Sequence, residues 1–148
     1  LTTTAKIKHR WEYMHDEIGY NFRMPNLNAA LGLAQLEKIN MFIKAKRTLF
    51  KKYYNVFNRI KGISIYKEPK NANSNYWLQT LVLNKKNIDL KNKILKESNK
   101  KLIYTRPVWK LISELRPYKK NQKMNLSGSQ EIYNKIVSLP SSQSLVLK

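Results

Sequence analysis

The side chains that most often carry enzyme chemistry are scarce in this sequence. Cysteine is absent, which excludes disulfides, thiolate metal sites and cysteine nucleophiles. The two histidines would need carboxylate partners to hold zinc, and Asp and Glu together number only 9 among 148 residues. No glycine-rich phosphate loop, nucleophile elbow or usefully spaced pair of carboxylates occurs either. The residue types alone therefore predict no self-sufficient catalytic centre.

Lysine is abundant and could act as a nucleophile, since the chain holds 23 of them. A lysine that forms a Schiff base must be desolvated, and most of these stand in polar company, often beside Asn. The formal charge of +20 would also suit a nucleic acid. The lysines are spread along the chain, however, as the coding bias of a genome rich in A and T would produce. No zinc finger, ribonucleoprotein signature or basic zipper is present.

One polar segment has the composition of an ordered loop. Gly19 and Asn21 tolerate unusual backbone angles, and Pro25 restricts the residue before it to extended geometry. Residues 15–26 are therefore predicted to form a loop, with Asn26 as the N-cap of a helix. The apolar face of that helix has helical spacing and comprises Leu27, Ala30, Leu31 and Ala34.

Hydrophobic periodicity predicts further helices along the chain. One runs from about residue 41 to residue 60, and its apolar face comprises Ile43, Phe50, Tyr54 and Phe57. Asp89 is predicted to cap a short helix. Ser127 and Gln130 fit the capping box of a last helix that ends at Pro140 and holds Ile132, Tyr133, Ile136 and Val137.

Strands are predicted at residues 63–66, 76–83 and 102–104, where the apolar pattern is strand-like. The apolar runs are far shorter than the roughly 20 residues that cross a membrane, so no membrane span is predicted. The fold class predicted from these elements is mixed α and β, as a compact unit behind a helical connector.

A longer motif runs from His15 to Glu37 and reads HDEIGYNFRMPNLNAALGLAQLE. This segment resembles the signature of the DegT/DnrJ-type sugar aminotransferases, pyridoxal-phosphate enzymes of fold type I. Shorter segments, at residues 1–6, 11–13, 75–78, 105–110 and 139–142, look like the branch that serves legionaminic-acid-type nonulosonate pathways. The resemblance covers essentially the whole chain.

This resemblance implies an α/β fold that is the C-terminal part of a fold-type-I transferase. Residues 1–40 would hold the end of the large domain, with the Gly-Tyr-Asn loop and the following helix. Residues 41–61 would form the connecting helix, and residues 62–148 the small C-terminal α/β domain. The first residues, Leu-Thr-Thr-Thr without an initiator Met, fit such a fragment.

The resemblance also implies an activity for the parent protein. It would transfer an amino group to a nucleotide-linked 4-keto-6-deoxy-hexose, N-acetylated and with glutamate as donor, for surface-glycan biosynthesis in the bacterial cytoplasm. Pyridoxal 5'-phosphate would supply the electron sink, and a homodimer would share its active sites. The family's Schiff-base lysine lies upstream of the matched segment, and Lys6 does not occupy its motif. The chain alone is therefore expected to be inactive.

Family likeness gives five residues candidate roles. Asn21 would bind the cofactor phosphate of the neighbouring subunit, or merely shape a turn, and Tyr20 would line the cofactor site or pack the interface. Arg23 would bind the nucleotide diphosphate or hold its own loop by an ion pair. Arg106 and Trp109 stand where many relatives carry a histidine that faces the sugar. Trp109 would stack on a sugar or base, or anchor a core or interface.

Two other function classes stay open from the sequence. One is a small basic nucleic-acid-binding protein, which would bind with a steep dependence on salt concentration. The other is an inactive aminotransferase remnant that keeps only a dimerisation role. The upstream reading frame discriminates between an enzyme and a remnant, because the enzyme needs about two hundred further residues with the family's lysine segment.

Overall fold

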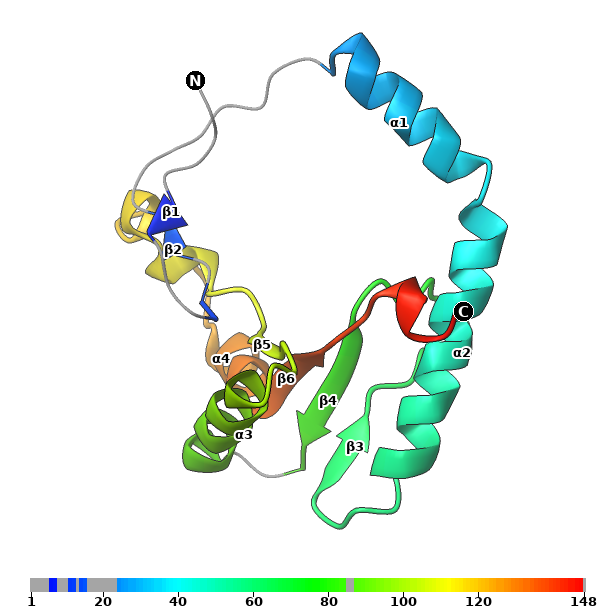
Figure 1. Cartoon of the computed structure of the whole chain (residues 1–148). Coiled ribbons are helices and arrows are strands. Elements are labelled where there is room, and N and C mark those ends of the chain that lie inside the picture. Colours follow the sequence, from blue (N-terminus) through cyan, green and yellow to red (C-terminus); the bar gives the residue numbers. More distant parts are fainter. Residues whose placement is uncertain (1–5, 8–10, 13, 16–23, 85–86, 148) are drawn as a thin grey trace.

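A computed structural model describes residues 6–7, 11–12, 14–15, 24–84 and 87–147 (Figure 1). The elements, in chain order, are β1 (Lys6–Ile7), β2 (Met14–His15), α1 (Asn26–Leu36), α2 (Ile39–Phe57), β3 (Ile63–Ile65), β4 (Gln79–Leu83), α3 (Ile88–Lys100), β5 (Arg106–Pro107), η1 (Ile112–Glu114), η2 (Arg116–Tyr118), α4 (Ser127–Lys135), β6 (Ile136–Leu139) and η3 (Gln143–Leu145). The mixed α and β class predicted from the sequence is confirmed. Among the described helices, none is long and apolar enough to cross a membrane.

The central element is a four-stranded antiparallel sheet in the order β3-β4-β6-β5, and β1 pairs with β2 in a separate ribbon. Ile65, Leu81 and Val137 are direct neighbours across three of these strands, so their side chains stand on the same face. Leu95 of α3 and the aromatic side chains of α2 pack against this face. The core therefore lies between one face of the sheet and the helices α2 and α3.

Helix α2 follows its predicted pattern closely. Its predicted face, residues Ile43, Phe50, Tyr54 and Phe57, is partly buried, and Ala45 and Leu49 beside it are fully buried. The helix begins two residues earlier and ends three residues earlier than the periodicity predicts.

The prediction for the last helix is wrong at both ends. Ser127 is the first helical residue, not the cap, and no capping box forms. The chain leaves the helix at Ile136, and Val137 becomes part of β6, where it pairs with Leu81 of β4. Val137 is completely buried there, so sheet pairing in the core overrides the local helical periodicity.

Two further predictions at the ends of elements are corrected. The N-cap of α3 is Asn87, whose side chain accepts a hydrogen bond from the Leu90 amide at 2.8 Å, and Asp89 lies inside the first turn. Pro25, not Asn26, precedes the first turn of α1.

The predicted strand at residues 102–104 is also wrong, because the chain turns back there. Leu102 takes a left-handed conformation with φ 61°, and the Ile103 amide donates to the Ser98 carbonyl at 2.8 Å. The Leu102 amide donates to the Asn99 carbonyl, which completes a Schellman motif at the end of α3. The strand forms only at Arg106–Pro107, after this turn.

Helix α1 lies apart from the sheet (Figure 1). None of its residues is buried, and Leu27 is 81% exposed while Leu31 is 63% exposed. The predicted helix exists, but within the described part of the chain nothing covers its apolar side chains.

Candidate functional site

A cavity of about 270 Å³ opens at one end of the sheet. Three segments line it: residues 77–78 before β4, residues 104 and 106–109 around β5, and residues 138–141 at the end of β6. The strand register explains why they meet, since Gln79 pairs with Leu139 and Arg106 pairs with Ser138. Segments far apart in the sequence thus form one cavity.

The cavity combines exposed aromatic rings with a guanidinium group. Trp77 is 66% exposed, Tyr104 62% and Trp109 59%, although each lines the cavity. Arg106 lines the same cavity. Flat aromatic faces stack on sugars and bases, and a guanidinium binds phosphate or carboxylate oxygens through paired hydrogen bonds. The two substrate-site residues predicted here, Arg106 and Trp109, are therefore brought together.

A buried polar cluster holds the strand that carries Arg106. The side-chain amide of Asn99 donates to the backbone carbonyls of Leu95 at 2.8 Å and Thr105 at 2.9 Å. The hydroxyls of Ser98 and Thr105 lie 2.5 Å apart. Asn99 and Thr105 are both buried, so these hydrogen bonds form away from water and fix the backbone directly before Arg106.

Helix α2 holds the other walls of the cavity. The Lys46 ammonium donates to the Trp77 carbonyl at 2.9 Å and to the Ser141 carbonyl. The Tyr53 hydroxyl donates to the Pro140 carbonyl at 3.0 Å. The Gln79 backbone amide donates to the Ser141 hydroxyl at 2.7 Å. Burial lowers the pKa of Lys46, because it removes water from the charged form.

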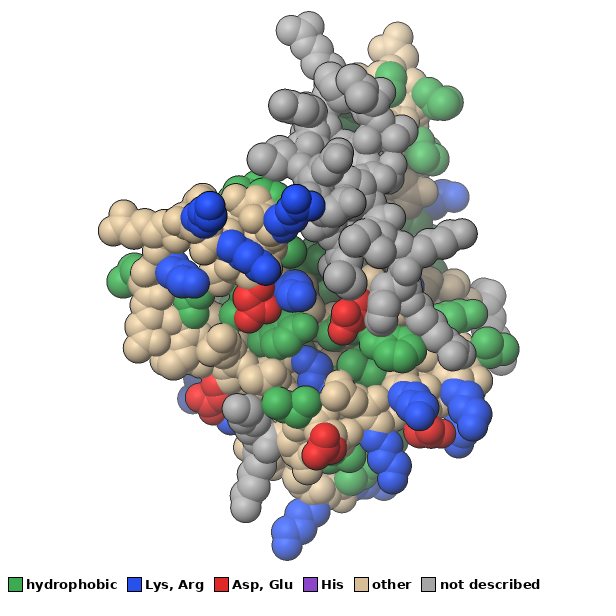
Figure 2. Space-filling view, turned by 90° about the vertical axis from the view of Figure 1, so that its left-hand side faces the viewer, with side chains coloured by type: hydrophobic (Ala, Val, Ile, Leu, Met, Phe, Trp, Pro, Cys, Tyr) green, Lys and Arg blue, Asp and Glu red, His purple; other side chains and the backbone are tan. Residues whose placement is uncertain are grey.

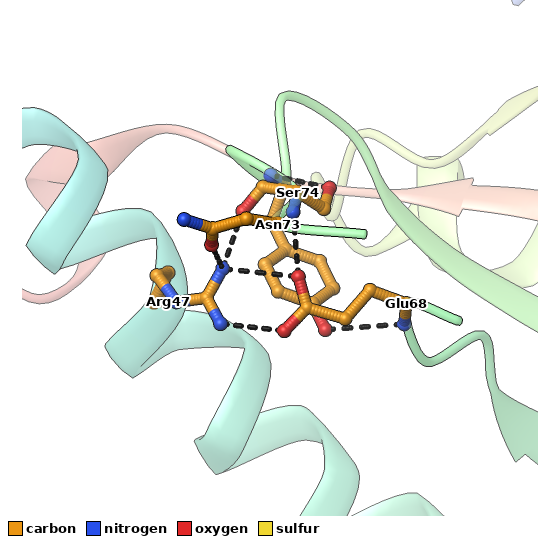
Figure 3. A network of polar contacts seen from close by, with 5 residues as sticks. Arg47, Glu68, Asn73 and Ser74 are labelled. Atoms are coloured by element: carbon orange, nitrogen blue, oxygen red, sulfur yellow. Dashed lines mark hydrogen bonds and ion pairs between the residues drawn. The ribbon is translucent and has the colours of Figure 1, made fainter. Parts of the chain in front are cut away.

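The loop before Trp77 is held by an ion pair that α2 also supplies (Figure 3). Arg47 meets both carboxylate oxygens of Glu68, at 2.5 and 3.1 Å, and also donates to the Asn73 side chain and the Ser74 carbonyl. Glu68 in turn accepts from the Ser74 amide at 2.5 Å. The Arg47 side chain lowers the pKa of Glu68, and the Ser74 amide adds to this shift. Glu68 and the Ser74 backbone amide thus complete a hydrogen-bonded network around the Arg47 guanidinium.

Tyr76 connects this network to the core. Its ring stacks on Phe50 with centroids 4.1 Å apart, and the Arg47 guanidinium lies 5.3 Å from the ring centroid. Its hydroxyl accepts from the Glu68 amide at 3.3 Å. Tyr76 itself has φ 47°, a left-handed conformation that is rare for an aromatic residue. The buried ring thus holds a strained stretch of backbone directly before Trp77.

The described residues offer no amine for a Schiff base in this cavity. The Lys46 ammonium donates hydrogen bonds to the backbone carbonyls of Trp77 and Ser141. No lysine is among the residues that line the cavity. Burial also lowers the pKa of Lys91, but this amine donates to the Tyr133 carbonyl and lies 4.1 Å from the centroid of that ring. No three His, Cys, Asp or Glu side chains of the described residues could hold a metal ion.

Three of the predicted site residues, Tyr20, Asn21 and Arg23, lie outside the described residues. Sequence reasoning missed Lys46 and Arg47 as wall supports. A signal for them exists, since both fall between Ile43 and Phe50, within the apolar stripe of α2. A cation in such a stripe needs acceptors, and carbonyl and carboxylate groups supply them.

The basic side chains visible in Figure 2 are spread over one face of the molecule, with acidic and hydrophobic side chains between them. Among the described residues, this face therefore shows no uninterrupted basic stripe of the kind that follows a nucleic-acid backbone.

Comparison with known proteins adds a family to this geometry. Residues 3–148 match the model of the DegT/DnrJ/EryC1/StrS aminotransferase family. The chain belongs to this family. Among curated relatives, it is 34% identical over 138 residues to the GDP-perosamine synthase of Escherichia coli O157:H7, which covers 93% of this chain and 36% of that protein. It is also 35% identical over 100 residues to EpsN of Bacillus subtilis, described as a putative pyridoxal phosphate-dependent aminotransferase, covering 66% of this chain and 25% of EpsN.

Two solved structures, PseC and DesI, share the fold of this chain. PseC of Helicobacter pylori, an aminotransferase of pseudaminic acid biosynthesis, superposes with a TM-score of 0.75 at 24% identity, over 95% of this chain and 38% of PseC. DesI, solved with its TDP-sugar product, gives a TM-score of 0.75 at 18% identity over 85% of this chain and 33% of DesI. The predicted fold, that of fold-type-I transferases, is thereby confirmed. The chain spans only about a quarter to two fifths of the length of EpsN, the E. coli GDP-perosamine synthase and PseC.

Proposed function

We propose that this chain is the C-terminal part of a pyridoxal-phosphate-dependent enzyme that aminates a nucleotide-linked 4-keto-6-deoxy-hexose, with glutamate as the amino donor. Family membership supports an aminotransferase, and the names of its relatives include nucleotide-sugar enzymes. The observation that carries the proposal is the cavity in which Arg106 meets Trp77, Tyr104 and Trp109. The N-acetylated sugar and the legionaminic-type nonulosonate pathway belong to the same proposal.

Each group in the cavity has a role in holding such a substrate. The Arg106 guanidinium would bind the negative charge of the diphosphate, and Trp109 would stack on the sugar or the base. The rings of Trp77 and Tyr104 would remove water from the bound molecule on the other walls. These contacts orient the sugar, which lowers the barrier of a reaction that needs close alignment.

The cofactor site is not complete in the described residues. When bound, pyridoxal phosphate supplies the electron sink for amino transfer. It needs a lysine amine, and neither Lys46 nor Lys91 offers one, since both donate to backbone carbonyls. We therefore assign the Schiff-base lysine to another part of the parent protein, and we expect the 148-residue chain to transfer no amino groups by itself. Asn21 and Tyr20 keep their proposed cofactor roles in the shared site.

The proposed parent is a cytoplasmic homodimer with shared active sites. Its large domain would end within residues 1–40, residues 41–61 would connect, and residues 62–148 would form the small domain. The composition of α1 supports this division, because apolar side chains occur on more than one side of the helix, at Leu27, Leu31, Leu33 and Leu36, and all are exposed. A helix that is apolar on several sides is typical of a buried position. The rest of the parent dimer would cover it.

Titration of the 148-residue chain with GDP-mannose, UDP-N-acetylglucosamine and dTDP-glucose tests the substrate role of the cavity. Calorimetry should show saturable binding of at least one probe. Arg106→Gln should weaken it by about tenfold or more, the size of a lost charge-assisted hydrogen bond. The matched control is Arg116→Gln, because Arg116 is exposed on η2 outside the cavity lining and carries the same charge.

Two results would contradict the assignment. The first is that none of the three probes binds saturably. The second is that Arg106→Gln and Arg116→Gln weaken probe binding equally, which would indicate attraction by net charge alone. Duplex DNA is included as a competitor, since tight salt-dependent binding to it would instead support the nucleic-acid alternative.

A further inference from the structure

We infer that Lys46 is a positioning residue that holds two walls of the cavity at their working separation, so that it sets substrate affinity without touching the substrate. This inference rests on the proposed function of the cavity. Lys46 is not among the residues that line the cavity, but its ammonium donates to a carbonyl in each of two lining segments, at Trp77 and Ser141.

The two walls come from different strands. Trp77 precedes β4, and Ser141 follows β6, so the Lys46 ammonium joins the entry of one strand to the exit of its neighbour. The strand ladder between them ends at the pair of Gln79 and Leu139. Beyond that pair the walls depend on side-chain bonds, of which Lys46 supplies two.

The backbone of Trp77 has few other supports. Its amide donates to the Asn75 side chain, two residues away, at 2.9 Å. Among the hydrogen bonds of the described residues, the bond from Lys46 is the one that joins the Trp77 backbone to a distant element. The indole itself is mostly exposed, so packing does little to fix it. Its place in the cavity therefore depends on its backbone, which the buried Tyr76 supports from the preceding residue and Lys46 holds at the carbonyl.

The backbone of Lys46 is itself held by a hydrogen bond from Gln79. The Gln79 side chain is completely buried, and its amide donates to the Lys46 carbonyl at 3.1 Å. The Gln79 backbone amide donates to the Ser141 hydroxyl. Lys46, Gln79 and Ser141 thus form a closed set of contacts that joins α2, β4 and the end of β6. Such a closed set transmits the position of the helix to both walls.

The test compares Lys46→Met, which keeps the length of the stem and removes the ammonium, with Lys52→Met on the exposed side of α2. Binding of the three nucleotide-sugar probes is measured for both. We expect Lys46→Met to weaken binding by about tenfold and Lys52→Met to leave it within about twofold. Far-ultraviolet circular dichroism checks that both variants are folded.

A second readout does not depend on substrate. In a background of Trp11→Phe and Trp109→Phe, Trp77 is the remaining tryptophan, and its quenching by acrylamide reports how it is held. Lys46→Met should change the quenching constant and the fluorescence anisotropy of Trp77, whereas Lys52→Met should not. A purely structural role for Lys46 would lower the melting temperature but leave both Trp77 readouts unchanged.

The outcomes separate the two proposals. If no probe binds the unmodified chain but Trp77 quenching changes in Lys46→Met, the proposed substrate role fails and the positioning role stands. If probes bind with equal affinity to Lys46→Met and Trp77 is unchanged, the positioning role is overturned. Should Lys46→Met fail to fold, Lys46→Gln, whose side chain is shorter and uncharged, replaces it, and unchanged affinity and quenching there overturn the inference.

Discussion

Helices α1 and α2 follow one another in the chain and meet different surroundings (Figure 1). Both have apolar residues at helical spacing. On α2, Ala45 and Leu49 are buried, whereas none of the residues of α1 is. The difference teaches that periodicity predicts a helix and its apolar face, while burial depends on what lies opposite. For α2 that is the sheet, whereas no described residue buries a side chain of α1.

Truncation of one leucine on each helix gives the largest expected contrast. Leu49→Ala removes a side chain that is 4% exposed and should lower the free energy of unfolding by about 2–5 kcal/mol. Leu31→Ala, at 63% exposure, should change it by less than about 0.5 kcal/mol. Urea denaturation of the 148-residue chain measures both. Equal losses would show that α1 is packed in solution as α2 is.

Removal of the Glu68 charge, which pairs with Arg47 of α2, should lower stability by a smaller amount that depends on pH. The pKa of Glu68 is lowered in the folded chain, chiefly by Arg47, so the unfolded chain binds the proton more readily. The carboxylate therefore adds stability above its ordinary pKa, and this contribution is lost as the pH falls through the lower, folded value. Glu68→Gln should lower the melting temperature at pH 7, and the gap to the unmodified chain should narrow toward pH 3.

The control for this measurement lies at the end of α1. Glu37→Gln removes the same charge from an exposed residue, and its melting temperature should follow that of the unmodified chain across the same range. A gap for Glu68→Gln that stays constant with pH would mean that shape, not charge, fixes the loop before Trp77.

The smallest expected effect on stability comes from making α1 polar. The double variant Leu27→Gln and Leu31→Gln keeps good helix formers on exposed positions, so the free energy of unfolding should change by less than about 0.5 kcal/mol. Sedimentation velocity should show less self-association than for the unmodified chain, because exposed leucines favour contact between copies. A loss of stability comparable to that of Leu49→Ala would contradict the exposed state of α1.

Much of the fold could be predicted, and the exceptions have a common cause. The face of α2 was predictable because the pattern is long and regular. The end of α4 was not, because Ile136 and Val137 continue the helical spacing but pair with β4 instead. The turn at Leu102 was missed for a similar reason, since hydrogen bonds to Ser98 and Asn99 fix a left-handed leucine that sequence rules assign to a strand.

The candidate site divides in the same way. Arg106 and Trp109 could be named from the family-like segment around β5, and both line the cavity. The support by Lys46 could not be predicted, because its acceptors are backbone carbonyls, which every residue carries and no sequence pattern marks. The partners lie 31 and 95 residues away along the chain.

The sequence by itself determined the family, the mixed α and β class and the helix-forming periodicity, because these depend on residue types and their local spacing. The tertiary structure decided which apolar faces are covered, where β6 replaces helix, and how Trp77, Arg106 and Trp109 come to share one cavity. The physical reason is that burial and hydrogen bonding in the core join residues distant in sequence. Their free energy outweighs local preference wherever the two differ.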